Sequence, residues 1–216
     1  MSNGTAARRV LATRNASWAR ALSQRLAAGG VQPNAVSVLS VVFAAGAAVA
    51  FVMAPVSGRY TASLLIAAAC IQLRLLCNML DGMLAIEGGL KSRTGDIYNE
   101  LPDRIADIVI FVGAGYALRD VPYGPALGWL AAVLALLTAY IRVLSGSLGL
   151  PQRFLGPMAK QHRMFVLTLA ALIAAVEAPF SASPRALGAG LAVIGLGSGV
   201  TAWRRTRHLM RDAEAR

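Results

Sequence analysis

The chain has 216 residues, of which 56% are hydrophobic and 14% are charged, and its mean hydropathy is +0.58. This composition argues against an ordinary soluble domain, which contains a smaller share of apolar residues. The formal net charge is +11, but the positions of the basic residues indicate a membrane topology and not a nucleic-acid partner.

Residues 1–30 combine spaced apolar side chains with five arginines. The stretch "RRVLATRNASWARALSQRLAAGG" has no continuous apolar core, so we expect no cleavable signal in it. Its spacing predicts an amphipathic helix that lies in the membrane interface. A disordered basic tail is the alternative. The apolar side of the predicted helix consists of Val10, Leu11, Trp18, Leu22 and Leu26.

Six apolar segments follow, each bounded by Pro, Gly or charged residues. They cover residues 35–54, 61–86, 96–118, 125–148, 163–180 and 186–203. About 20 apolar residues suffice for a helix to cross the hydrocarbon core. A soluble six-helix bundle is the alternative, but its helices would each have a polar face, and "VSVLSVVFAAGAAVAFVMA" has none. We therefore predict an all-α integral membrane protein with six transmembrane helices preceded by the amphipathic interfacial helix.

The basic residues gather on one side of this topology. If the N-terminus is cytoplasmic, fifteen Lys and Arg residues fall on the cytoplasmic side and three, Arg59, Arg119 and Arg185, fall on the other. This asymmetry obeys the positive-inside rule. It predicts a multi-pass protein of a bacterial inner membrane with both termini in the cytoplasm, where the basic ends attract anionic lipid headgroups.

These patterns divide the chain into three parts. Residues 1–30 form a cytoplasmic amphipathic segment, residues 31–205 form a six-helix transmembrane catalytic domain, and residues 206–216 form a basic cytoplasmic tail.

Most of the negative charge lies in one stretch, "NMLDGMLAIEGGLKSRTGDIYNELPDRIAD" (78–107), which holds six of the ten acidic residues. On a helix, the first part of this stretch places Asn78, Asp81, Gly82 and Ala85 on one face. In the second part, steps of four residues align Gly95, Asn99, Asp103 and Asp107. The connection of residues 87–94 is short, so we expect the two helices to be antiparallel neighbours whose polar faces meet near their cytoplasmic ends.

Clustered carboxylate and amide oxygens suit a hard cation such as Mg²⁺ or Mn²⁺ better than zinc. One alternative is that the carboxylates only neutralise Arg74 and Arg104, but two arginines do not balance six acids. The other alternative is an acid-lined cation transporter. Its acidic residues would extend through the whole membrane depth, whereas this cluster occupies a single depth.

The spacing of the cluster resembles the signature of the CDP-alcohol phosphotransferases (CDP-alcohol phosphatidyltransferases). That signature reads D-x-x-D-G-x-x-A-R, about eight residues, then G-x-x-x-D-x-x-x-D. This chain has N78-x-x-D81-G82-x-x-A85-I86 and G95-x-x-x-N99-x-x-x-D103. The stretch "QPNAVS" (32–37) also resembles a Pro-Asn element of the family, and the resemblance covers most of the chain.

Three positions depart from the signature. Asn78 and Asn99 replace two aspartates, a combination typical of one bacterial branch, and Ile86 replaces the arginine. Asparagine ligates a cation through its amide oxygen but contributes no charge. Further negative charge would come from the substrate pyrophosphate or from Asp96, Glu100 or Asp107.

The resemblance implies a phospholipid-synthesis enzyme that transfers a phosphatidyl group from a CDP-linked donor, such as CDP-diacylglycerol, to an alcohol and releases CMP. It implies Mg²⁺ or Mn²⁺ as cofactor, a homodimer, and Asp103 as the general base. The metal ligands would be Asn78, Asp81, Asn99 and Asp103. The nucleotide-binding residues would be Asn34, Gly82, Ala85, Ser92, Arg93 and Gly95.

A basic segment, "RFLGPMAKQHR" (153–163), lies between the fourth and fifth predicted spans. The cations of this segment are Arg153, Lys160 and Arg163. Together with Arg74 they are candidates for binding a phosphorylated acceptor, because Lys and Arg bind anionic groups. A loop that only fixes the topology is the alternative.

Two other functions of the protein stay open: a catalytically degenerate protein that binds CDP-lipid, and a cation-coupled transporter. The acceptor alcohol is not specified.

Overall fold

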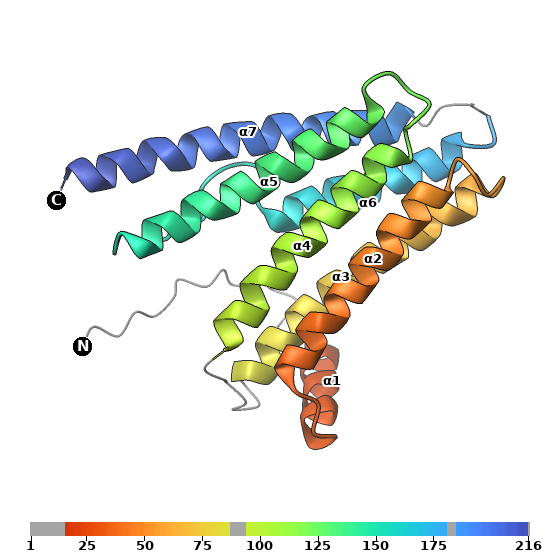
Figure 1. The fold of residues 1–216 in the computed structure, drawn as a ribbon. Helices are drawn as coiled ribbons and strands as arrows, with labels where there is room; N and C mark the ends of the chain where they lie inside the picture. Colours follow the sequence, from red (N-terminus) through yellow and green to blue (C-terminus); the bar gives the residue numbers. More distant parts are fainter. Residues whose placement is uncertain (1–15, 87–93, 181–184, 216) are drawn as a thin grey trace.

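The computed structural model describes residues 16–86, 94–180 and 185–215, apart from the side chain of Asp96. These residues form seven helices and no strand, which confirms the all-α class (Figure 1). The helices are α1 (Ser17–Ala28), α2 (Pro33–Met53), α3 (Tyr60–Ile86), α4 (Gly95–Tyr116), α5 (Gly124–Ser147), α6 (Lys160–Glu177) and α7 (Arg185–Glu214).

A helix lies at each of the six predicted spans, and α1 lies within the predicted interfacial segment. Four of the described helices, α2, α3, α5 and α7, are long and apolar enough to cross a membrane. By contrast, α4 begins with the polar half of the acidic stretch, and α6 is short and begins with "KQHR". The protein therefore has the helices of a multi-pass membrane protein. Helix α7 continues through the predicted tail to Glu214.

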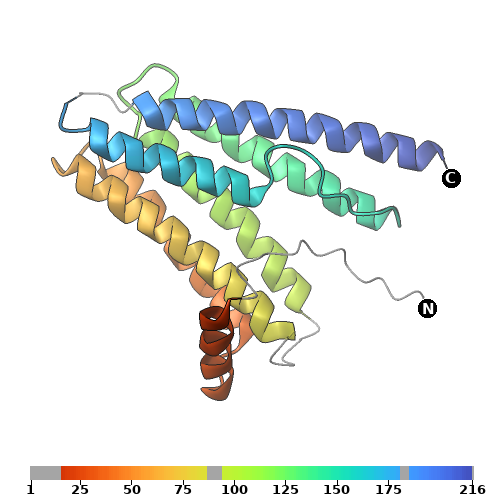
Figure 2. The ribbon, with the colours of Figure 1, turned by 180° about the vertical axis from the view of Figure 1, so that it is seen from behind.

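The helices run alternately up and down, so their ends sort into two groups. The N-terminal ends of α2, α4 and α6 lie at the same end of the bundle as the C-terminal ends of α3, α5 and α7 (Figures 1 and 2). The acidic stretch and the basic segment are both at this end. The topology thus places the two oppositely charged segments of the sequence near each other.

Helix α2 supplies most of the packing around α3 and α4. It packs extensively against both, whereas α3 and α4 touch each other only slightly. Small buried residues on α2 permit this close approach, among them Ala44, Ala47 and Ala48. The expected meeting of the polar faces of α3 and α4 is present, because Arg74 of α3 binds Asp103 and Asp107 of α4, but the two helices have few close backbone contacts. They run in opposite directions (Figure 1), and their polar faces are joined by long side chains.

Helix α1 covers the part of α3 that bears the first half of the motif. Ala19 of α1 is buried against Met79 and Met83, and Leu22 and Leu26 pack beside another small apolar cluster. Elsewhere on α1, Trp18 is exposed. The helix therefore has one face on the protein and one face free, and Trp18, which was expected on the apolar side with Leu22 and Leu26, does not lie against the protein.

Helices α4 and α5 cross at a pair of glycines. A Cβ atom added to Gly128 would lie 2.6 Å from the carbonyl oxygen of Phe111 and 2.7 Å from the Cα atom of Gly115. Both neighbours are backbone atoms, which cannot move aside without separating the helices. Small residues at such crossings let membrane helices pack by direct backbone contact.

We predict that Gly128→Leu lowers the free energy of unfolding by about 1–3 kcal/mol, because overpacking a tight contact forces the backbones apart. The midpoint of thermal unfolding in detergent measures the effect. Gly199→Leu is the matched control, because no atom lies within 4 Å of a Cβ added at that position of α7. Equal midpoints for the two variants would contradict the close crossing.

Candidate active site

Asp103 of α4 is buried and has three cationic neighbours. The ammonium of Lys160, from α6, donates a hydrogen bond to its Oδ2. Nη2 of Arg74, from α3, lies 3.4 Å from its Oδ1. Nη2 of Arg104 lies 3.8 Å from Oδ2. Both oxygens of this carboxylate are therefore paired with positive charge.

Asp107, one turn further along α4, joins two buried arginines. Nη2 of Arg74 donates to Oδ1 at 2.8 Å, and Nη2 of Arg163 donates to Oδ2 at 3.0 Å. Arg163 also donates to the hydroxyl of Thr138 at 3.2 Å and to the carbonyl oxygen of Met158 at 3.0 Å. Side chains from α3 and α6 thus meet at one carboxylate of α4, and α5 joins the network through Arg163. Charge-assisted bonds of this kind are strong where water is excluded.

Asp81 of α3 is buried but only half satisfied. Ser37, near the start of α2, donates to its Oδ2 at 2.7 Å, while its Oδ1 has no partner among the described residues. The carboxylate lies close enough to Asp103 and Lys160 to interact with both electrostatically. The amide nitrogen of Asn78, one turn before, is buried and also lacks a described partner. An unpaired buried carboxylate oxygen is costly, so these groups are available for a ligand.

The residues present fit a divalent cation. In the described part of the chain, no three His, Cys, Asp or Glu side chains form a metal-binding group, but the predicted ligand set has only two carboxylates and completes the set with amides. The unpaired Oδ1 of Asp81 suits a cation ligand, since a hard cation takes carboxylate oxygens. Asn99, the second asparagine among the predicted ligands, is exposed on the N-terminal part of α4.

A second group of contacts is linked to the charged cluster through Glu100 of α4 and was not predicted from the sequence. Arg142 of α5 pairs with Glu100 at 2.5 Å, donates to Gln152 at 2.9 Å, and lies 5.5 Å from the ring centroid of Phe154. It connects α4 to the loop that precedes α6. An arginine within an apolar segment is itself a signal of a buried partner, so the position of Arg142 offered a clue.

Only part of the predicted acceptor group lies at the acidic cluster. The structure brings Arg74, Lys160 and Arg163 to the carboxylates of α4. Arg153 instead makes two bonds to Asp212 of α7, at 2.9 and 3.1 Å, and is exposed. The loop is also fixed by Arg205, which the sequence analysis gave no role in the site and which donates to the carbonyl oxygens of Leu155 and Thr138.

The predicted nucleotide-binding residues are divided among three segments. Gly82 and Ala85 are half-buried on the last turns of α3, Gly95 is the first residue of α4, and Asn34 is half-buried in the first turn of α2. All four lie at the end of the bundle that carries the acidic cluster (Figure 2). Ser92 and Arg93 lie outside the described residues.

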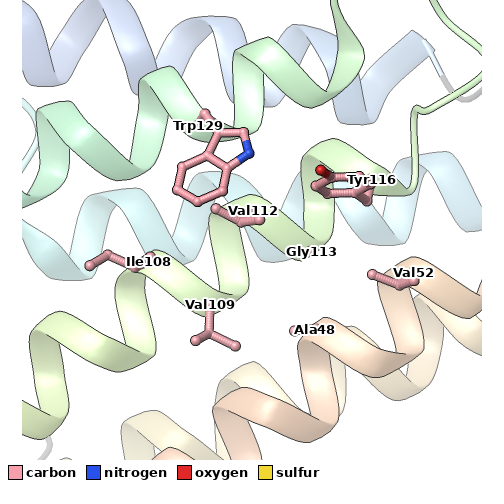
Figure 3. A pocket seen from close by; sticks show the side chains of 8 residues that line it. All are labelled: Ala48, Val52, Ile108, Val109, Val112, Gly113, Tyr116 and Trp129. Atoms are coloured by element: carbon pink, nitrogen blue, oxygen red, sulfur yellow. The ribbon is translucent and has the colours of Figure 1, made fainter.

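The opposite face of α4 carries an apolar groove of about 490 Å³ between α2 and α5 (Figure 3). The lining residues that α4 contributes lie on the side of the helix roughly opposite Asp103 and Asp107. Its lining is Ala48, Val52, Ile108, Val109, Val112, Gly113, Tyr116 and Trp129. Because it is almost entirely apolar, the groove is separate from the charged site.

Comparison with known proteins assigns the family. The family model for CDP-alcohol phosphatidyltransferases matches residues 31–203, so the chain belongs to this family. It is an enzyme of the phosphatidyltransferase class, which acts in phospholipid synthesis. No curated protein sequence matches the chain.

Solved structures agree with this assignment. The Mycobacterium tuberculosis phosphatidylinositol phosphate synthase PgsA1 with CDP-DAG bound is similar, with a TM-score of 0.76, 25% identity, and coverage of 90% of this chain and 94% of that chain. The same enzyme in complex with manganese and citrate has the same fold, with a TM-score of 0.76 and 24% identity over 89% of this chain and 88% of that chain.

We predict that Asp107→Ala lowers the free energy of unfolding by about 3–5 kcal/mol, because it leaves Arg74 and Arg163 buried with one counter-charge fewer. Thermal unfolding in detergent, monitored by loss of helical circular dichroism, measures the change. Asp120→Ala is the control. It removes the carboxylate of an exposed ion pair with Arg119 at 4.0 Å, which contributes little. A loss for Asp107→Ala no larger than the control would show that Asp107 does not hold the helices together.

Proposed function

We propose that the protein transfers a phosphatidyl group from CDP-diacylglycerol to an alcohol, releases CMP, and requires Mg²⁺ or Mn²⁺. The observation that carries this proposal is the buried, unpaired Oδ1 of Asp81, which lies in electrostatic range of Asp103. The similarity to PgsA1 with CDP-DAG bound supports the donor, and the PgsA1 complex with manganese supports a divalent cation.

The cation would be held by Asn78, Asp81, Asn99 and Asp103. When bound, it would polarise the phosphoryl group and neutralise the departing CMP. The charges of the site indicate the conditions for binding. Three buried acids, Asp81, Asp103 and Asp107, face three cations, Arg74, Lys160 and Arg163. Arg104 is a further cation, 3.8 Å from Asp103. The group therefore has no excess of negative charge, so a divalent cation is favoured only together with an anion such as the substrate pyrophosphate.

The donor nucleotide would lie beside Gly82 and Ala85, whose small side chains leave the backbone of α3 accessible. Asn34 and Gly95 would border it, and Ser92 and Arg93 would be further nucleotide-binding residues. Asp103 would accept the proton of the alcohol as its oxygen attacks the phosphorus of the phosphatidyl group. A phosphorylated acceptor would be attracted by Arg74, Lys160 and Arg163.

The membrane placement is part of the same proposal. Helices α4 and α6 would span the bilayer with α2, α3, α5 and α7, so that six helices cross a bacterial inner membrane. The end of the bundle with the acidic cluster would face the cytoplasm, where CDP-linked donors are water-accessible through their nucleotide. The protein would act as a homodimer, as implied by its resemblance to the family.

A second candidate is a family member that binds CDP-lipid without turnover. Two observations favour it: Asn78 and Asn99 carry no charge, and the carboxylate of Asp103 is already paired with Lys160 and Arg74. Release of CMP distinguishes the two candidates, because a protein that only binds the donor leaves its pyrophosphate intact.

We predict that purified protein releases CMP from CDP-diacylglycerol in the presence of Mg²⁺ or Mn²⁺ and a suitable alcohol, tested over glycerol phosphate, inositol phosphate, phosphatidylglycerol and serine. Asp81→Ala and Asp103→Ala should each abolish release and remain folded, since each removes one of the two charged ligands. Asp120→Ala, a carboxylate outside the site, should keep wild-type activity. Activity within a few-fold of wild type in Asp81→Ala or Asp103→Ala would exclude the proposed metal site.

A further inference from the structure

The three cations around Asp103 differ in the number of other contacts that hold them in place. Arg74 has a side chain that is 0% exposed, and it also contacts Asp107 at 2.8 Å and the main-chain oxygen of Asp103 at 3.3 Å. Arg104 also pairs with Glu100 of its own helix, at 3.5 Å. Neither arginine depends on Asp103 alone for its position.

Lys160 differs from both arginines. It is the first residue of α6, its side chain is 24% exposed, and Asp103 is its only side-chain partner among the described residues. A lysine has a flexible four-carbon stem and a compact charge. Of the cations on Asp103, Lys160 is therefore the one that can leave at the smallest cost in other contacts.

A divalent cation at the site competes with this ammonium. The free oxygen of Asp81 is available, but Oδ2 of Asp103 is held by Lys160 and Oδ1 faces Arg74. Two positive charges cannot share one carboxylate oxygen without strong repulsion. A cation that binds both aspartates therefore requires the Lys160 side chain to move, and an incoming phosphate gives the ammonium a new partner.

We propose that Lys160 is a displaceable counter-ion. Its ammonium occupies Asp103 until a divalent cation binds there, and then it pairs with a phosphate of the CDP-linked donor. The inference rests on the proposed function. It makes Lys160 a positioning residue that links the two ligands. Because such a link is reciprocal, the anion strengthens binding of the cation by the same factor as the cation strengthens binding of the anion.

The test is the affinity of the full-length protein in detergent for Mn²⁺, with and without CDP. The electron paramagnetic resonance signal of free Mn²⁺ reports binding without any turnover. Lys160→Met should bind Mn²⁺ alone about 10-fold more tightly than wild type, since the cation no longer displaces a charge-assisted bond. The gain in affinity on adding CDP should be smaller in Lys160→Met. Chelation of Mn²⁺ by CDP itself is the same for both proteins and cancels.

Three further variants separate displacement from general electrostatics. Lys160→Arg, which keeps the charge, should stay close to wild type. Arg153→Met should not change Mn²⁺ affinity, because this guanidinium is paired with Asp212. Arg104→Met removes a charge that lies 3.8 Å from Asp103 but leaves Lys160 on Oδ2, so its gain should be smaller than that of Lys160→Met.

The outcomes distinguish this inference from the proposed function. Equal Mn²⁺ affinity in wild type and Lys160→Met, or an equal gain in Arg104→Met, would overturn the role of Lys160 and leave the metal site in place. Absence of Mn²⁺ binding in every protein, even with CDP, would overturn both. If Lys160→Met does not fold, Lys160→Gln, which keeps a hydrogen bond to Asp103 without the charge, should show the same tighter binding.

Discussion

A single buried carboxylate, Asp107, determines how the helices around the site are arranged. Helices α3 and α4 touch only slightly, so their polar faces are held at a fixed separation by Arg74, which reaches from one helix to the other. Arg163 binds the second oxygen of Asp107 and brings in α6. A low-dielectric surrounding makes these bonds strong and the loss of one partner costly. Asp103 takes its position from the same arginine, and the geometry of the site follows from this pair of contacts.

The same network explains why the site needs a ligand of each sign. Its arginines and lysine already offset the charge of its aspartates, so a divalent cation alone would add unbalanced positive charge in a medium that tolerates little of it. Asp81 is the exception within this balance, because one of its oxygens is buried with no partner in the part of the chain that the structure describes. Two asparagines at motif positions keep the negative charge low. A CDP-linked donor with its divalent cation adds both signs together, which is the combination this arrangement favours.

The fold was largely predictable from the sequence because apolar length and Pro or Gly boundaries mark each helix. The spacing of four residues also placed Asp103 and Asp107 on one face of α4, where both are buried. The contacts between helices were not predictable in this way. Sequence spacing orders residues within a helix, whereas the close packing of α2 against both α3 and α4 depends on the fit of small side chains. For the same reason, the partner of Arg153 proved to be Asp212, a residue 59 positions away on α7.

A divalent cation and a CDP moiety should bind together at Asp81 and Asp103. Crystals of the protein grown with Mn²⁺ and CDP would test this directly, through the anomalous diffraction of manganese. We predict an anomalous peak within ligand distance, about 2.1–2.3 Å, of Oδ1 of Asp81 and of an oxygen of Asp103. We also predict that the Lys160 ammonium has moved from Asp103 to a phosphate oxygen. A peak away from these two aspartates, or well-ordered CDP at the site without manganese, would contradict the joint binding.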